Sequence, residues 1–240
     1  MTSTLAQSPA TPPVVDRETW LRRRDELLVR EKAHTRAQDA LAAARRRLPM
    51  TELAPISLVG EHGPTPLADI FAGRDQLLVF NHMWHLGKPF DQQCEGCTLN
   101  IWNFQDAAYL EACGISFAVF CAGPYDEIAP FREFMGYTHP WYSTCRIDDP
   151  AVADGGAIAC YLRRDDRVFL TYTADNRGAE PMMTSLMLLD MTVYGRQERW
   201  EDSPDGWPQR PTCHFWRTNG RPTAQWTRPG VTPVRAGRTR

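Results

Sequence analysis

Two cysteines separated by two residues, Cys94 and Cys97, precede a segment that is typical of a helix. Cysteines at positions i and i+3 in the first turn of a helix face the same way and lie within reach of a disulfide. Free backbone amides and the positive end of the helix dipole stabilise a thiolate at the first position. The motif therefore predicts a dithiol–disulfide switch, with Cys94 as the nucleophile and Cys97 as the shielded, resolving cysteine.

The two residues between the cysteines refine this prediction. Glu95 places a negative charge beside the Cys94 thiolate, so it opposes ionisation and favours a reducing dithiol over a strongly oxidising one. Gly96 carries no side chain and leaves room for the backbone of a substrate to approach. We therefore expect Glu95 and Gly96 to form part of a substrate groove beside the two thiols.

Short apolar runs alternate with helical stretches from Pro55 onward, which predicts an α/β fold. The near-continuous apolar run at 115–120 is typical of a central strand that is buried on both faces. Crossovers between the early strands imply parallel pairing, whereas the last two strands form an antiparallel hairpin. The expected strands are 56–59, 77–80, 115–120, 157–162 and 167–173, with a short strand or loop edge at 141–145, and the expected helical segments are 67–71, 98–112, 127–135 and 179–189.

The chain is predicted to have four parts. Residues 1–15 are expected to be a flexible leader, and residues 16–49 a helical extension that Asp16 caps and Pro49 ends. Residues 50–198 form the α/β domain, and residues 199–240 form an irregular arm rich in proline and tryptophan. The arm is expected to pack its tryptophans on the domain or on a second subunit.

The predicted N-terminal helix carries a partial apolar stripe that includes Trp20, Leu21 and Leu27, and it is strongly basic. Nine arginines and one lysine between Arg17 and Arg47 stand against five acidic residues. A surface that binds RNA or a partner is one interpretation, but a solvated helix face is the one we prefer. Because the helix and the arm both extend beyond a minimal domain, a homodimer through them is a further hypothesis.

Composition limits the partners and the compartment. A formal charge of −2 over 240 residues gives no electrostatic reason to expect binding to nucleic acid or membranes. No run reaches the length of about 18 apolar residues that a membrane span needs. Residues 1–13 lack the basic and apolar regions of a secretory signal, which favours a cytoplasmic protein. The cysteine count of seven is odd and too low for a disulfide-stapled domain, so four of them are interpreted as small core residues: Cys113, Cys121, Cys145 and Cys160.

A zinc site competes with the dithiol switch as an explanation of the cysteine pair. Zinc needs four ligands, and a second CxxC motif is absent from the sequence. The remaining ligands would come from His82, His85, His139 and the Cys213–His214 pair. The redox interpretation is preferred in an α/β context, and we expect no metal or organic cofactor. A zinc-stabilised or partner-binding domain stays open as the non-enzymatic alternative.

A thiol peroxidase is the other alternative. Peroxide would oxidise Cys94 to a sulfenic acid, and Cys97 would then close the disulfide. The residues before Cys94, which include Pro89, Gln92 and Gln93, match the Pro/Thr/Cys constellation of peroxiredoxins poorly.

A recognisable pattern runs through several segments: residues 20–31, 77–84, 94–102, 129–137, 139–141, 168–173 and 189–196. They resemble the DUF899 family of bacterial thioredoxin-like proteins, and the resemblance extends over about residues 14–200. It implies a thioredoxin-like, peroxiredoxin-like fold with a mixed central sheet flanked by helices. It also implies a dithiol–disulfide oxidoreductase, whose substrate would be a disulfide-bearing protein or a small thiol. Trp84, which ends the second segment, is placed with the substrate groove.

Two segments depart from the pattern of the relatives. In thioredoxins a cis-proline faces the CxxC motif and helps to hold the substrate, whereas the equivalent stretch here contains Gly155 and Gly156 and no proline. Glycines still allow close backbone approach, so both are placed in the expected substrate groove. Relatives end in a Trp-rich segment followed by an Arg-His-Asp-Glu-Tyr-like motif, where this chain has Phe215–Asn219 without the acidic residues.

Overall fold

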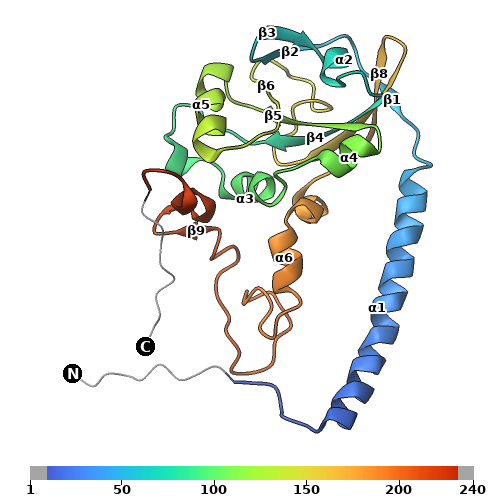
Figure 1. Cartoon of the computed structure of the whole chain (residues 1–240), viewed down its shortest axis with the longest axis vertical. Coiled ribbons are helices and arrows are strands. Elements are labelled where there is room, and N and C mark those ends of the chain that lie inside the picture. Colours follow the sequence, from blue (N-terminus) through green and yellow to red (C-terminus); the bar gives the residue numbers. More distant parts are fainter. Residues whose placement is uncertain (1–9, 232–240) are drawn as a thin grey trace.

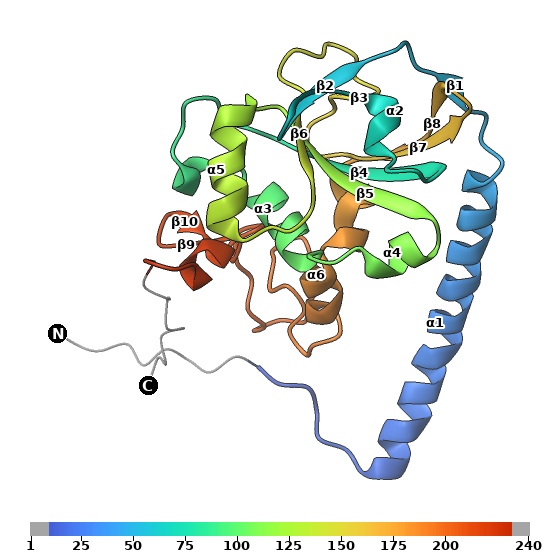
Figure 2. The ribbon, with the colours of Figure 1, turned by 45° about the horizontal axis from the view of Figure 1, so that its top comes forward.

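The computed structural model describes residues 10–231, so most of the expected leader (1–9) and the last part of the arm (232–240) lie outside the described residues. A long helix, α1 (Arg17–Arg45), begins after Asp16, whose side chain accepts the Thr19 backbone N–H at 2.8 Å; the predicted N-cap is confirmed. None of the residues of α1 is buried, and the helix stands apart from the sheet in both views (Figure 1, Figure 2). Its apolar stripe therefore does not pack on the domain.

An eight-stranded mixed sheet forms the centre of the protein, in the order β1-β8-β7-β4-β5-β6-β2-β3. The parallel pairs β4–β5 and β5–β6 lie in the middle, and the antiparallel hairpin β7–β8 joins the other side of β4. The strands are β1 (Thr51–Glu52), β2 (Ser57–Gly60), β3 (Gly63–Pro66), β4 (Gln76–His82), β5 (Ile115–Cys121), β6 (Trp141–Ser143), β7 (Ile158–Arg164) and β8 (Arg167–Ala174).

Helices cover both faces of this sheet. Residues of α3 and α5 belong to one apolar cluster, and residues of α2 belong to the cluster on the opposite face. No helix among residues 10–231 combines the length and the apolarity needed to cross a membrane. The helices after α1 are α2 (Leu67–Ile70), α3 (Glu95–Asn103), α4 (Ala108–Ala112), α5 (Tyr125–Met135) and α6 (Thr184–Leu189), with 3-10 turns at Phe90–Gln92, Asn176–Met182 and Thr223–Thr227.

Side chains along β4 alternate between the two apolar clusters. Leu77 and Val79 face the side that α2 covers, whereas Leu78 and Phe80 face the side that α3 and α5 cover. Because both faces are covered, the strand is apolar from Leu77 to Phe80, and β5 is apolar from Phe117 to Cys121 for the same reason. The chain leaves β4 at His82 and enters α3 at Glu95, so the fold holds the CxxC motif at the carboxyl end of the most central parallel pair.

These pairings confirm the thioredoxin-like α/β fold that the sequence predicts. β4, α3, α4 and β5 form a crossover unit with parallel strands, and the late hairpin adds antiparallel strands beside β4. The short edge strands β1 and β3 are absent from the prediction. Each has four residues or fewer, and β3 contains glycine and two prolines, so neither shows an apolar alternation.

The prediction of a continuous helix is wrong in two places. The segment 98–112 is interrupted after Asn103, and the Asp106 side chain accepts the Ala108 backbone N–H at 2.6 Å in an Asx turn just before α4. The segment 179–189 begins as a 3-10 turn that contains Pro181, and it becomes α-helical only afterwards.

Two of the four cysteines expected in the core lie on the surface. Cys121 is buried and Cys160 is partly buried, as predicted for small apolar residues. Cys113 and Cys145 are exposed, because Cys113 follows the last residue of α4 and Cys145 lies just beyond β6.

The C-terminal arm runs from residue 199 to residue 231 in the described chain and ends next to α3 (Figure 1, Figure 2). It contains a small hairpin of β9 (Arg217–Thr218) and β10 (Arg221–Pro222), followed by the last 3-10 turn. β10 contacts both α3 and the turn at Phe90–Gln92. The arm thus reaches the segment that carries the two cysteines.

Candidate active site

The loop after β4 and the start of α3 position the two cysteines. Cys94 is the N-cap residue of α3, and its Sγ accepts the backbone N–H of Cys97 at 3.4 Å. This amide belongs to the first turn of the helix, where backbone N–H groups have no carbonyl partner within the helix. Cys94 is partly buried, whereas Cys97 is 3% exposed. The pair therefore lies at a helix N-terminus, with the first sulfur the more accessible of the two.

The two thiols differ strongly in proton affinity. A hydrogen bond from the Cys97 thiol is the largest cause that lowers the pKa of Cys94 to about 6, and the Cys97 backbone N–H adds to the effect. Burial and the charge of Glu95 act in the opposite direction. The same thiol–thiol hydrogen bond, followed by burial, raises the pKa of Cys97 well above that of an ordinary thiol. At neutral pH the thiolate therefore lies on Cys94, while Cys97 keeps its proton.

The backbone N–H of Met83 donates a hydrogen bond to Cys97 Sγ at 3.3 Å. Met83 follows β4 directly, so the central strand itself fixes the position of the second sulfur. This bond also favours the thiolate form of Cys97, although burial outweighs it in the reduced protein. The Met83 N–H is therefore in place to stabilise the Cys97 thiolate when this thiol loses its proton.

Glu95 forms an ion pair with Arg217 of β9, with Nε and Oε2 at 3.1 Å. The guanidinium of Arg217 also donates to the backbone carbonyls of Asp91 at 2.6 Å and Gln93 at 2.8 Å. The sequence predicts the sign of the Glu95 effect correctly, because its charge raises the pKa of Cys94. It does not reveal the cation that compensates this charge.

The ring of Trp216 lies directly on Gly96. A Cβ atom built on Gly96 would sit 2.7 Å from Cζ3 of the indole, closer than packed atoms approach. The prediction that Gly96 leaves room for a substrate backbone is therefore wrong in this structure, because Trp216 of the protein's own arm fills that space. Glycine is required here because of the indole, since the backbone of Gly96 is helical and has no positive φ.

Of the other groove residues, the two glycines lie beside the thiols and Trp84 does not. Gly155 and Gly156 line the same cavity as both cysteines, and Gly155 lies so close to Met83 that an added Cβ would sit 2.9 Å from its Cγ. Trp84 packs against α5, where its Nε1 donates to the Glu127 carboxylate at 2.7 Å and its ring contacts Phe131.

A cavity of about 420 Å³ adjoins the two cysteines. Its walls come from the end of β4, the first turns of α3, the 154–156 loop, the 3-10 turn before α6 and the arm. Its lining includes Asn100, Asp154, Asp175, Arg177, Glu180, Arg196, Glu198, Cys213 and Trp216. Cys213 thus adds a third thiol to the wall, and its pKa is raised to about 11 by burial and by the charge of Glu198.

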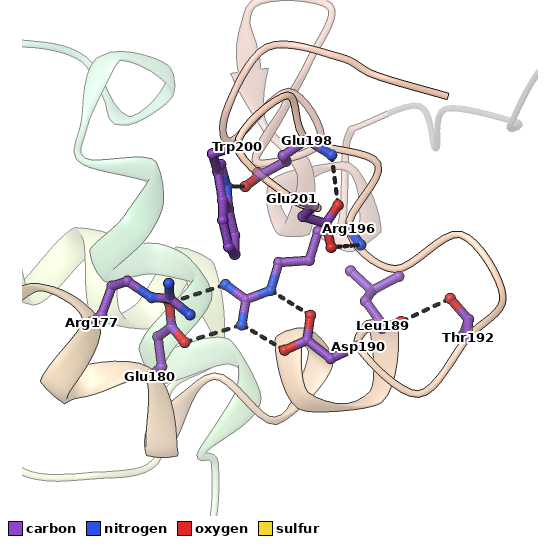
Figure 3. A network of polar contacts seen from close by, with 9 residues as sticks. All are labelled: Arg177, Glu180, Leu189, Asp190, Thr192, Arg196, Glu198, Trp200 and Glu201. Carbon is purple, nitrogen blue, oxygen red and sulfur yellow. Dashed lines mark hydrogen bonds and ion pairs between the residues drawn. The ribbon is translucent and has the colours of Figure 1, made fainter. Parts of the chain in front are cut away.

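A buried polar network fastens the start of the arm to the domain (Figure 3). The guanidinium of Arg196 is 5% exposed and donates two hydrogen bonds each to Glu180 and Asp190, at 2.8–3.0 Å. Glu198 then accepts the Trp200 indole N–H and the Cys213 backbone N–H, both at 2.5 Å. These bonds cross the expected boundary between residues 198 and 199, and they hold Cys213 at the cavity.

Each histidine that the sequence offered as a zinc ligand is turned toward a backbone carbonyl. His82, His85, His139 and His214 hydrogen-bond the carbonyls of Met83, Gln92, Phe104 and Arg196. Within residues 10–231, no group of three or more His, Cys, Asp or Glu side chains is arranged to hold a metal ion. All seven cysteines are free thiols in this structure.

The sequence does not assign three residues to the thiol site: Cys213, Trp216 and Arg217. Cys213 is predicted only as a possible zinc ligand, and Trp216 only as one of the tryptophans that pack on the domain or on a second subunit. Arg217 lies 122 positions after its partner Glu95, and no local pattern connects segments so far apart. The only signal is the position of Phe215–Asn219, which corresponds to the terminal motif of the relatives.

A family model matches most of the chain. Residues 9–220 match the family described as a bacterial protein of unknown function, DUF899. No curated protein matches.

Among solved structures, the chain is similar to peroxidoxin BcpB from Mycobacterium tuberculosis, with a TM-score of 0.42 and 16% identity over 59% of this chain and 97% of that one. It is also similar to a thiol:disulfide interchange protein of the thioredoxin family from Chlorobium tepidum TLS, with a TM-score of 0.32 and 9% identity over 57% of this chain and 96% of that one. The family match, which spans far more than half of the sequence, shows that the chain belongs to the DUF899 family.

Proposed function

We propose that this protein is a thiol–disulfide oxidoreductase in which Cys94 attacks a substrate disulfide and Cys97 resolves the product. The main support is the unequal proton affinity of two thiols on one helical turn, with a partly exposed thiolate at Cys94 and a buried, protonated thiol at Cys97. A structural cysteine pair would have no need of this difference.

The reaction follows from that difference. The Cys94 thiolate attacks one sulfur of the substrate R–S–S–R′, which breaks the S–S bond, releases R′–S⁻ and leaves a Cys94–S–S–R mixed disulfide. Cys97 then loses its proton, and the Met83 N–H at 3.3 Å stabilises the new thiolate. Attack on Cys94 Sγ closes the Cys94–Cys97 disulfide and releases R–S⁻, and a dithiol reductant restores the protein. Two electrons pass from the protein to the substrate in each cycle.

The test separates the roles of the two cysteines. Cys94→Ser should abolish disulfide reduction, and Cys97→Ser should accumulate mixed disulfides that mass spectrometry locates on Cys94. The exposed Cys113→Ser variant is the control and should behave like the unchanged protein. Full turnover by Cys94→Ser would overturn the proposal, as would a purified protein whose cysteine pair resists oxidation.

A thiol peroxidase is a second candidate, because Cys94 combines a pKa of about 6 with a position in the wall of a cavity. Hydrogen peroxide would oxidise the thiolate to a sulfenic acid, and Cys97 would displace water to form the same disulfide. Peroxide consumption no faster than that of a free thiol removes this candidate and leaves the first.

We also propose that the protein acts in the cytoplasm and forms a homodimer. A switch that cycles through the reduced form suits a reducing compartment such as the cytoplasm. A homodimer stays a prediction, and the exposed apolar residues of α1 would supply its contact surface, among them Val29 (67% exposed) and Leu41 (57% exposed). Sedimentation of the full chain and of a Val29→Glu variant tests it.

A further inference from the structure

The arm restricts the size of what reaches Cys94. Trp216 occupies the face of Gly96, and Arg217 holds the arm to the 91–95 segment with an ion pair and two backbone hydrogen bonds. An extended polypeptide therefore has no free path across the CxxC turn. The remaining approach is the cavity of about 420 Å³, a volume in the range of small-molecule sites.

An unpartnered acceptor lies in the wall of this cavity. Asn100 is 3% exposed, and its Nδ2 donates to the Gly96 carbonyl at 3.1 Å, which fixes the orientation of the amide. Its Oδ1 is buried and has no hydrogen-bond partner within the described chain. Buried polar atoms without a partner are rare in folded proteins. The position therefore calls for a donor on a bound molecule.

The charges at the cavity point to the same kind of ligand. Asp154 and Asp175 are exposed at its rim, and within residues 10–231 neither carboxylate has an ion-pair or hydrogen-bond partner. By contrast, Glu180 is paired with both arginines of the cavity, Arg177 and Arg196. Arg177 also lies over the Trp200 ring at 4.7 Å. The uncommitted charged groups of the cavity are therefore these two carboxylates, while the unpartnered Nε1–H of Trp216 is an uncharged donor.

We propose, on the basis of the function proposed above, that the substrate of this site is a small disulfide that carries an ammonium group. The ammonium lies at the rim beside Asp154 and Asp175, and an N–H of the ligand reaches Asn100 Oδ1 after the residues that cover this oxygen have moved. Cys94 attacks the nearer sulfur and releases half of the molecule as an aminothiol; Cys97 then releases the second half and closes the protein disulfide. One disulfide is reduced to two thiols, and the protein dithiol supplies both electrons.

The experiment compares two small disulfides of opposite charge in single turnover. Reduced, desalted protein is mixed with cystamine, which carries two ammonium groups, or with 3,3′-dithiodipropionate, which carries two carboxylates. Acid quenching and mass spectrometry give the rate of Cys94–Cys97 disulfide formation. Each rate is divided by that of N-acetylcysteine with the same disulfide, which removes the intrinsic reactivity of the probe. We expect the normalised rate to be at least tenfold higher for cystamine.

Variants connect this preference to the two carboxylates. Asp154→Asn and Asp175→Asn should each lower the normalised cystamine rate about threefold to tenfold, and leave the dithiodipropionate rate unchanged or raise it. Asp39→Asn, which removes an exposed carboxylate from α1, is the control and should change neither rate.

The outcomes distinguish the two proposals. If both probes oxidise the Cys94–Cys97 pair at equal normalised rates, or if the two variants behave like the control, the ammonium substrate is wrong while the oxidoreductase stands. Faster reaction with a protein disulfide such as insulin than with either probe also overturns the small substrate. If no disulfide oxidises the pair, both proposals fail.

Discussion

Arg217 forms an ion pair with Glu95 across 122 residues of sequence, and this pair brings a cation to the only acidic side chain between the two cysteines. Glu95 raises the pKa of the neighbouring Cys94 thiol, so its charge slows the chemistry that the motif otherwise favours. The cation that the arm supplies therefore offsets the effect of the Glu95 charge on the pKa of Cys94.

Removal of this cation should make the Cys94 thiolate less stable. Arg217→Gln is expected to raise the pKa of Cys94 by about half a unit, the size that a partly exposed ion pair allows. The measurement is the pH dependence of Cys94 alkylation. Arg221→Gln, which removes the Asp91 partner on the same hairpin, is the matched control. If Arg217 acts through Glu95, the double variant with Glu95→Gln regains the lower pKa; a pKa that stays high in the double variant contradicts this mechanism.

Alkylation of the unchanged protein should show the two thiols separately. Because the pKa of Cys94 is lowered to about 6, its thiolate predominates above pH 6 and the rate should reach a plateau near pH 7. Cys97 should stay unmodified throughout this range. A single titration near pH 8.5, the ordinary value for a thiol, contradicts the arrangement.

The reduction potential should lie above the thioredoxin-like value that Glu95 alone suggests. A lowered pKa of the nucleophile stabilises the reduced form, so we expect a potential between about −270 mV and −120 mV, the values of thioredoxin and DsbA. Equilibration with glutathione buffers measures it. A potential below that of thioredoxin would show that the thiolate of Cys94 contributes little to the stability of the dithiol.

Gly96 and Trp216 should be coupled in a double-mutant cycle. In an ordinary helix Gly→Ala stabilises by about 0.5–1 kcal/mol, but a Cβ at position 96 would meet the indole at 2.7 Å. Gly96→Ala alone should therefore lower the free energy of unfolding in urea, and it should raise it in a Trp216→Ala background. Equal effects in both backgrounds would mean that the ring does not rest on this glycine in solution.

His82 should make the protein sensitive to mild acid. Burial lowers its pKa to about 4, so the folded protein holds the ring neutral while the unfolded chain binds a proton below pH 6.5. The contribution of the neutral His82 ring to the free energy of unfolding is fully present above pH 6.5. It is lost as the pH falls toward 4, and the total loss is about 3 kcal/mol. Urea unfolding at pH 7 and pH 4.5 measures the loss. His82→Phe should lose less over the same interval, and an equal loss would assign the effect to other groups.

Loss of the buried Arg196 should lower the stability of the protein more than loss of the exposed Arg177, which pairs with the same carboxylate. Arg196→Met leaves Glu180, whose side chain is 12% exposed, without its bidentate partner, and should cost about 3 kcal/mol of stability. Arg177→Met removes the second ion pair of the same carboxylate, but that arginine is 68% exposed, so the cost should stay below about 1 kcal/mol. Chemical denaturation of both variants compares them, and equal costs would contradict the ranking by burial.

The sequence predicts those parts of the structure whose causes are local. The apolar runs of β4 and β5 reflect burial on both faces, Asp16 caps α1, and Gly136 ends α5 with a φ of 68° that suits glycine. The helix breaks also have local causes, but Asp106 lies inside an apolar pattern that conceals them.

The covered face of the motif could not be predicted in the same way. From its neighbours in the sequence alone, Gly96 predicts open space beside the thiols. In the structure this space is filled, because Trp216 of the arm packs against Gly96. The buried ion pairs of Arg196 could not be predicted either, because its partners Glu180 and Asp190 are acidic residues that would be expected on the surface. Contacts between distant segments therefore decide access to the thiols, while the local pattern decides their chemistry.

The distance along the chain between the motif and its cover has a consequence for biosynthesis. A ribosome that adds about 5–20 residues per second needs about 6–24 s to travel the 122 residues from Glu95 to Arg217. During that interval the nascent chain carries a reactive dithiol with no indole above it. The unfinished protein therefore depends on its surroundings to keep both sulfurs reduced, and only the completed polypeptide controls access to them itself.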